Sequence, residues 1–179
     1  MEGTILVGDH LLLNKWMYGP RIPFTHWRFP VLKKPQRGEI VIFRYPRDPR
    51  IRFVKRAVAV GGDKVEIRNG TVFVNDVAEN EPYALHSGDP HSPVENMAAR
   101  VMRPDELFVL GDNRDNSEDS RFWGPLPVAN VIAEPVMIFW SYDAPTAAWL
   151  ADDHRLSFWA SVAENMISHT RWNRTAILL

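Results

Sequence analysis

Residues 111–125 read GDNRDNSEDSRFWGP and follow the apolar run 107–110, LFVL, which is typical of a buried strand. Asp, Asn and Ser side chains hydrogen-bond to nearby backbone groups and therefore favour turns. Two arginines stand among four acidic residues in this stretch, and an arginine can form two parallel hydrogen bonds to one carboxylate. We therefore predict a rigid loop that is held by its own side chains, the kind of loop that carries a functional site.

Two other interpretations of this loop stay open. One is a solvated acidic loop without a chemical role. The other is a calcium loop, because polar and acidic side chains occupy alternate positions from residue 113 to residue 119, as at the start of an EF-hand. Glu118 stands where that loop needs glycine, Gly124 stands where it needs a bidentate glutamate, and the arginines would repel a cation.

Length and composition limit the classes of protein that this chain can belong to. With 179 residues, of which 45% are hydrophobic, it suits one domain with a real core. The net charge of −1 gives no electrostatic argument for nucleic-acid binding, and the absence of cysteine excludes disulfide and thiolate chemistry. The longest apolar run, 128–140, is interrupted by Glu134 and Pro135, so no membrane span is predicted within the chain.

The pattern of the remaining chain predicts short antiparallel strands. Fourteen prolines and ten glycines favour many turns. Strands are predicted over residues 4–9, 10–15 and 39–45, and a hairpin is predicted over 64–74, because Asn69-Gly70 between alternating strands favours a type I′ turn. Residues 76–104 show no clear periodicity and are predicted to be mostly loop.

Lys55 is the most informative residue outside the loop. In the predicted strand 51–60, the positions on its side of the strand carry only apolar side chains, including Ala57 and Ala59. An amine held on such a face loses hydration, which disfavours the ammonium form and lowers its pKa. A neutral amine can act as a general base. A lysine that extends to the edge of the sheet and into water is the alternative.

Other common catalytic and binding signatures are absent from the sequence. There is no HExxH, P-loop, GxGxxG or GxSxG pattern, and the six histidines have no ligand spacing. No metal and no cofactor are therefore expected. The chemistry is expected to depend on Lys55 and on the hydroxyl groups of the loop 111–125.

At these residues the sequence resembles the type I signal peptidases, a family of membrane-bound serine proteases with a Ser/Lys dyad. Four blocks match the motifs of the family in order. They are MEGTILVGD at 1–9, RGEIVIF at 37–43, FVKRAV at 53–58 with Gly-Asp at 62–63, and the loop at 111–124. The last block is nearly identical to the family motif GDNRDNSxDSRxWG and is highly specific. The resemblance covers residues 1–140.

The resemblance implies a mainly β fold with coiled antiparallel sheets, of the type shared by signal peptidases and self-cleaving repressor proteases, with a small β insertion. Residues 1–62 and 105–150 are expected to form a discontinuous catalytic β core. Residues 63–104 are expected to form the insertion, which contains the hairpin. Residues 151–179 are expected to form a C-terminal segment, in which 152–168 favours a short amphipathic helix. The side chains expected to face inward are those of Leu156, Trp159, Val162, Ala163 and Met166.

The resemblance also implies the roles of the site residues. A neutral lysine takes the proton of the nucleophilic serine, which attacks the scissile carbonyl. Lys55 matches that general base, and Ser117 matches the serine whose hydroxyl orients the lysine. Support of the loop is expected from Asp112, Arg114, Asp119 and Arg121.

Two positions depart from the family pattern. The nucleophilic serine of the family directly precedes the residue that matches Met1, so it is absent from this chain, and the chain as written is expected to be inactive. The proline of the first block is replaced by Gly3, which loosens the backbone beside the expected nucleophile.

Substrate and location follow from the same resemblance. The expected substrates are the signal peptides of secretory preproteins, cut after small-x-small sequences. The expected location is the extracytoplasmic (periplasmic) face of the cell membrane, in contact with the lipid surface through aromatic side chains of residues 16–29. Shallow apolar pockets for the substrate, or alternatively plain core packing, are expected from Met1, Ile5, Leu11 and Val54.

Two alternatives to the signal peptidase interpretation stay open. A self-cleaving repressor protease shares the Ser/Lys chemistry, but it needs an internal Ala-Gly or Cys-Gly site, and this chain contains neither dipeptide. A non-catalytic paralogue would bind preproteins or membrane without cutting them. Gly3 and the missing serine favour this second alternative.

Overall fold

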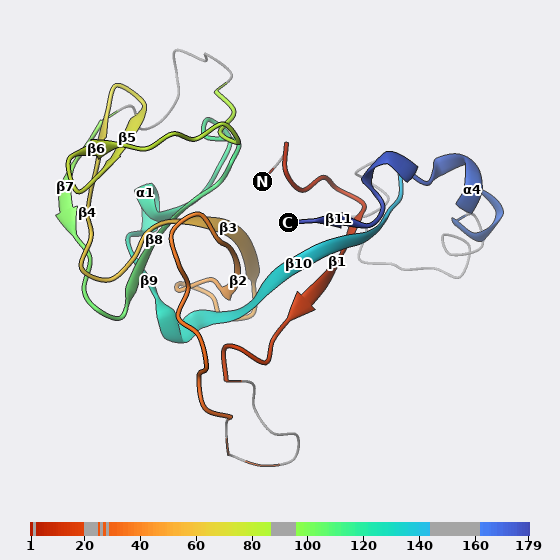
Figure 1. Cartoon of the computed structure of the whole chain (residues 1–179), viewed down its shortest axis with the longest axis horizontal. Coiled ribbons are helices and arrows are strands. Elements are labelled where there is room, and N and C mark those ends of the chain that lie inside the picture. The colour runs from red at the N-terminus through yellow and green to blue at the C-terminus, as the bar shows by residue number, and fades with distance from the viewer. Residues whose placement is uncertain (2, 20–24, 26, 28, 87–95, 144–161) are drawn as a thin grey trace. The chain divides into compact units, whose positions relative to one another are not determined.

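The computed structural model describes all residues except 2, 20–24, 26, 28, 87–95 and 144–161 (Figure 1). The described chain divides into two compact units. The first contains Met1, Gly3 and Asn14–Glu134, and the second contains Thr4–Leu13 and Pro135–Leu179. No helix within the described ranges is long and apolar enough to cross a membrane. The predicted division into core, insertion and C-terminal segment stays a prediction.

The larger sheet of the first unit is antiparallel (Figure 1). The start of β10 pairs with β2, and the order continues from β2 to β3, β8 and β9. These strands are β2 (Ile40–Arg44), β3 (Arg52–Ala59), β8 (Glu106–Leu110), β9 (Leu126–Pro127) and β10 (Val131–Ser141), and a short 3₁₀ helix, η1 (Val128–Asn130), precedes β10. The prediction of a mainly β fold with antiparallel sheets is therefore confirmed.

Strand β8 is buried on both of its faces, which explains its uninterrupted apolar sequence. Leu107 and Val109 pack into one hydrophobic cluster with Phe43 of β2, whereas Phe108 and Leu110 pack into a second cluster. All four side chains of β8 from residue 107 onward are at most 1% exposed. The loop 111–125 therefore begins at one of the most deeply buried points of the first unit.

A second, four-stranded sheet lies between β3 and β8 in the sequence (Figure 1). Its strand order is β6-β5-β4-β7. The predicted hairpin is confirmed, because β4 pairs with β5 across Asn69 and Gly70, which have φ angles of 48° and 77° as a type I′ turn requires. The strands are β4 (Lys64–Arg68), β5 (Thr71–Val74), β6 (Val77–Ala78) and β7 (Met97–Val101).

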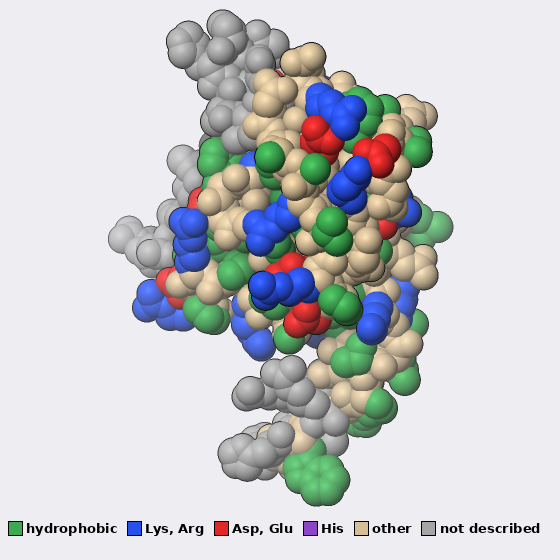
Figure 2. Space-filling model, turned by 90° about the vertical axis from the view of Figure 1, so that its left-hand side faces the viewer, with side chains coloured by type: hydrophobic (Ala, Val, Ile, Leu, Met, Phe, Trp, Pro, Cys, Tyr) green, Lys and Arg blue, Asp and Glu red, His purple; other side chains and the backbone are tan. Residues whose placement is uncertain are grey.

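The described residues of 76–104 are mostly loop, as predicted, but the prediction missed the strands β6 and β7. Strand β7 is an edge strand that pairs only with β4 among the described strands. Four of its five residues are exposed, so it shows no alternation of apolar and polar side chains that a sequence pattern could detect. On the face in Figure 2, Lys and Arg side chains are interspersed with Asp and Glu side chains.

In the second unit, β10 pairs with β1 and with β11. The predicted strand over residues 4–9 is wrong, because residues 4–8 form turns and a bend. The amide of Leu6 donates to Asp9 Oδ2 at 2.8 Å, which favours the turn over an extended strand. The elements are β1 (Asp9–Asn14), α4 (Met166–His169), the 3₁₀ helix η2 (Trp172–Arg174) and β11 (Ile177–Leu178).

The amphipathic helix predicted over residues 152–168 lies partly outside the described residues, which resume at 162. Residues 162–164 are helical. Val162 is buried as predicted, whereas Ala163, which was also expected to face inward, is exposed. Met166, which was expected to face inward, is 51% exposed in α4. Hydrogen bonds of Arg174 to Asp9 at 2.7 Å and of Arg171 to Asp143 at 2.6 Å connect this C-terminal part to the rest of the second unit.

Candidate active site

Lys55 lies in the middle of β3, where it is paired in register with Val41 of β2. Its ammonium Nζ lies 2.7 Å from the hydroxyl Oγ of Ser117, 62 residues further along the chain. The centre of the Phe53 ring, on the same side of the strand, lies 5.6 Å from Lys55 Nζ. Lys55 is half-buried, so its amine is partly removed from water and points at a hydroxyl of the loop.

Burial lowers the pKa of Lys55 below its ordinary value. The charges of the loop act in both directions, because Asp119 and Glu118 raise this pKa whereas Arg121 lowers it. The loss of hydration outweighs the acidic neighbours, and the net direction is downward. The amine is thus biased toward the neutral form that a general base needs.

The loop that carries Ser117 is held by a buried ion pair. Arg121 donates from Nε and Nη2 to the two oxygens of Asp119, both at 2.8 Å, and these side chains are 4% and 0% exposed. Asp119 Oδ2 also accepts the amide of Gly111 at 3.1 Å. The two ends of the loop are therefore joined through one carboxylate, which fixes the position of Ser117 between them.

One turn of helix, α1 (Ser120–Trp123), ends the loop and was not predicted from the sequence. Asp119 caps it, because its Oδ1 accepts the amide of Arg121 at 3.2 Å. The hydroxyl of Ser120 accepts the amide of Val109 in β8 at 3.0 Å. A sequence without apolar periodicity can thus form a helical turn when a capping side chain and a buried hydroxyl hold it.

A second ion pair joins the loop to the strand of Lys55. Arg56 donates from Nε and Nη2 to the two oxygens of Asp112 at 3.0 and 2.8 Å. The side chain of Asp112 is 1% exposed and that of Arg56 is 11% exposed. Arg56 directly follows Lys55 in β3. The ion pair between Arg56 and Asp112 therefore holds the loop close to Lys55.

Gly111 lies against the contact between Lys55 and Ser117. A Cβ atom at this position would lie 2.1 Å from Ser117 Oγ and 3.3 Å from Lys55 Nζ. Only a residue without a side chain leaves room for the hydroxyl and the amine to meet. The glycine that begins the loop motif is therefore required by close packing.

The four residues predicted to line substrate pockets are all half-buried. Met1 and Val54 belong to the first unit, and Ile5 and Leu11 belong to the second. Their role as pocket residues stays a prediction.

A model of the family described as signal peptidase, peptidase S26, matches residues 1–140 of this chain. The chain belongs to the signal peptidase family. The matched residues include Lys55, Ser117 and the whole loop 111–125.

Curated signal peptidases are similar in sequence to most of this chain. Signal peptidase I of Pseudomonas fluorescens is 32% identical, and the match covers 87% of this chain and 67% of that protein. Thylakoidal processing peptidase 1 of Arabidopsis thaliana is 39% identical over 150 residues, which cover 78% of this chain and 39% of that protein. A solved structure of signal peptidase I from Enterococcus faecalis V583 is 33% identical, with a TM-score of 0.48, and covers 57% of this chain and 97% of that one.

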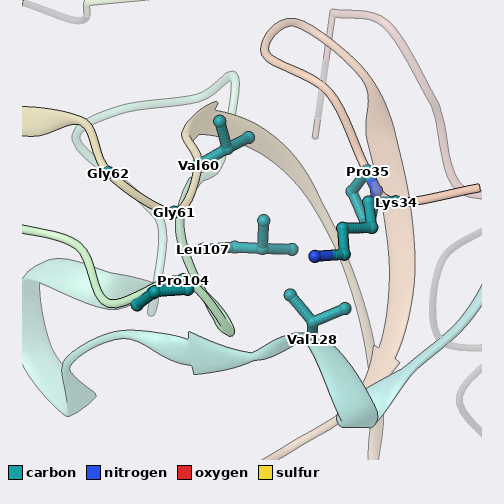
Figure 3. Close-up of a pocket in the computed structure, with 8 residues that line it drawn as sticks. All are labelled: Lys34, Pro35, Val60, Gly61, Gly62, Pro104, Leu107 and Val128. Carbon is teal, nitrogen blue, oxygen red and sulfur yellow. The ribbon is translucent and has the colours of Figure 1, made fainter.

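The first unit also has an apolar pocket of about 310 Å³ (Figure 3). Its lining includes neither Lys55 nor Ser117. Among the described residues that line it, Lys34 alone has an ionisable side chain, and its amine points into the pocket (Figure 3). The described residues of its lining carry no carboxylate and no hydroxyl group. It is lined by Lys34, Pro35, Val60, Gly61, Gly62, Pro104, Leu107 and Val128.

The sequence prediction missed two residues that contact the loop and its supports, Glu81 and Tyr83. The carboxylate of Glu81 binds Arg114 at 2.6 and 2.7 Å, and the ring of Tyr83 lies against Arg56. Both residues lie in the stretch that was predicted to be loop. The only signal there was an acid and an aromatic side chain on either side of a proline, which is too common to indicate a site.

We expect the substitution Glu118→Gln to lower the pKa of Lys55 further. Glu118 is exposed, its charge raises the pKa of Lys55, and its Oε1 accepts the hydroxyl of Tyr45 at 2.8 Å. Glutamine removes the charge but keeps an oxygen that can accept this hydrogen bond. NMR titration of the lysine side chain measures the effect. The control Tyr45→Phe keeps the carboxylate and is expected to change the pKa of Lys55 less, whereas a Lys55 pKa that is equal or higher in Glu118→Gln would contradict the prediction.

Proposed function

We propose that this chain is the catalytic region of a serine endopeptidase that removes signal peptides from secreted preproteins at small-x-small sites. The observation that carries the proposal is the 2.7 Å contact between the half-buried amine of Lys55 and the hydroxyl of Ser117. This contact lies within the part of the chain that matches the signal peptidase family. The names of the curated relatives support the same substrate class.

In the proposed mechanism the nucleophile is a serine placed directly before Met1. The neutral amine of Lys55 takes the proton of that serine hydroxyl while its oxygen attacks the scissile carbonyl carbon. The ammonium then gives the proton to the departing amide nitrogen, and the signal peptide remains attached as an ester. The same amine then deprotonates a water molecule, whose oxygen attacks the ester carbonyl carbon. The bond to the serine oxygen breaks, the ammonium returns its proton to that oxygen, and the signal peptide leaves with a carboxyl group at its end. The hydroxyl of Ser117 holds the amine in the orientation for these transfers.

We also propose that the enzyme works at the extracytoplasmic surface of a membrane. Trp16 and Trp27 are 66% and 76% exposed, and Trp16 lies edge-on to Phe29 with their ring centroids 5.5 Å apart. Exposed tryptophans of this kind are typical of proteins that rest at the boundary between lipid headgroups and water. The membrane surface would present signal peptides to the site as they emerge.

The decisive experiment extends the chain by a short polar segment whose last residue, directly before Met1, is serine. This Ser-extended protein is expected to cleave a peptide containing Ala-x-Ala after its second alanine, as mass spectrometry of the products would show. The matched control carries the same segment with alanine as its last residue and is expected to be inactive. Binding of the peptide without cleavage by the Ser-extended protein would instead support a non-catalytic paralogue.

A further inference from the structure

Residues 81–85, EPYAL, contact the loop 111–121 without belonging to any motif of the site. Arg114 donates from Nη1 and Nη2 to the two oxygens of Glu81 at 2.7 and 2.6 Å. The side chains of this pair are 4% and 9% exposed, so removal of either partner leaves a buried charge uncompensated. Arg114 also donates from Nε to the carbonyl of Gly111 at 3.2 Å. Glu81 therefore fixes, through Arg114, the backbone that lies against Ser117.

The same segment contacts the strand of Lys55. The guanidinium of Arg56 lies 3.9 Å from the centre of the Tyr83 ring, close enough for a cation–π interaction. The hydroxyl of Tyr83 donates to Glu81 Oε1 at 3.2 Å. Tyr83 thus covers the arginine next to Lys55 while it stays connected to Glu81.

Leu85 extends this connection to the N-terminal residues of the first unit. Its amide donates to the carbonyl of Asp112 at 2.7 Å, and its carbonyl accepts the amide of Arg114 at 2.9 Å. Its side chain lies over Gly3, because Cδ1 is 2.8 Å from the position that a Cβ of Gly3 would occupy. Gly3 has a φ of +104°, a conformation that favours glycine. Leu85 therefore contacts both the loop and Gly3, near the start of the chain.

We propose that residues 81–85 position the start of the chain, at Met1 and Gly3, relative to Lys55. Glu81 and Tyr83 hold residues 81–85 on the loop and on β3, and Leu85 contacts Gly3. This inference rests on the proposed function, because it assumes that the nucleophile directly precedes Met1. Glu81, Tyr83 and Leu85 are positioning residues. They act through Arg114, Arg56 and Gly3.

The first test uses the chain as it stands and needs no activity. In Glu81→Gln, the amides of Leu85 and Arg114 are expected to exchange hydrogen at least about tenfold faster, because the segment is held less tightly. The NMR titration of Lys55 is expected to shift toward that of an ordinary lysine as water reaches the amine. The matched control is Glu79→Gln, because Glu79 lies two residues upstream and pairs with Arg37 at 3.3 Å, away from the loop. Unchanged exchange and an unchanged Lys55 titration in Glu81→Gln would overturn the proposal.

The second test uses the Ser-extended protein. Leu85→Ala is expected to lower kcat for the Ala-x-Ala peptide by about tenfold with little change in KM, because the nucleophile is misplaced while peptide binding remains. Leu85→Met, which refills the space over Gly3, is expected to restore most of the rate. Cleavage by Leu85→Ala at the parent rate would overturn the positioning role. If the parent Ser-extended protein itself does not cleave, the proposed function fails, and the exchange experiment still decides whether the segment holds the loop.

Discussion

Replacement of Lys55 by methionine in the Ser-extended protein is expected to reduce kcat for an Ala-x-Ala peptide by at least about 10³-fold, because the nucleophile loses its base. Methionine keeps the length and the apolar stem of lysine. Ser117 loses its 2.7 Å contact with the amine but is half-exposed and can bond to water. Steady-state kinetics measure the loss. The control Lys64→Met removes a surface amine that pairs with Asp76 at 2.6 Å and is expected to keep full activity.

The same substitution is expected not to destabilise the fold at neutral pH. The pKa of Lys55 is lowered in the folded state, so the unfolded chain binds a proton there more readily than the folded chain. The free energy of unfolding is therefore highest above the pKa that Lys55 has in the unfolded chain. It decreases as the pH falls from that value through the lower pKa of Lys55 in the folded chain. Methionine removes this dependence, and the melting temperature of Lys55→Met should equal or exceed that of the parent protein. A fall of more than about 5 °C would mean that lost activity reflects unfolding.

The substitution Gly111→Ala is expected to reduce kcat by about 10²-fold, because the added methyl group displaces the hydroxyl that orients the amine. Its Cβ would lie 2.1 Å from Ser117 Oγ and 2.7 Å from Ser117 Cβ, so the loop must move. Overpacking of this kind also costs about 1–3 kcal/mol of stability, which urea unfolding measures.

Gly38→Ala is the matched control for this prediction. No atom lies within 4 Å of a Cβ at Gly38, so the substitution adds a methyl group without a clash, although the φ of +84° makes it strained. It is expected to lower stability and to leave kcat unchanged. Equal activity of the Gly111→Ala protein and its parent would show that the contact between Lys55 and Ser117 does not limit the reaction.

Some features of the site are visible in the sequence because they depend on local patterns. The strand of Lys55 has apolar positions on one side, and Ala57 and Ala59 are fully buried as that pattern implies. The hairpin at Asn69 and Gly70 was predicted because a type I′ turn needs two adjacent residues with positive φ. Asn-Gly is one of the few residue pairs that adopt this conformation readily. The loop motif places the ion-paired residues Asp119 and Arg121 and the glycine that begins it within fifteen residues, so its rigidity can be inferred without coordinates.

Other features depend on contacts between distant parts of the chain. Glu81 and Arg114 are 33 residues apart, and no periodic pattern relates them. The edge strand β7 is mostly exposed, so its sequence resembles that of a loop. The turn over residues 4–8 was predicted to be a strand because its apolar side chains outweighed the effect of Asp9, whose carboxylate binds the amide of Leu6. For Glu81 and for β7 the deciding interaction involves a distant partner, whereas the turn at residues 4–8 depends on a local hydrogen bond between Leu6 and Asp9.

The most direct test of the central claim is an NMR titration of the Lys55 side chain in the chain as it stands, with Lys55→Met used to assign its signal. We predict that Lys55 titrates below the ordinary lysine pKa of about 10.4, since burial disfavours its charged form. We also predict that its titration perturbs the signals of Ser117. A Lys55 pKa at or above the ordinary value would contradict the account, because the amine would then be charged when the reaction requires a base.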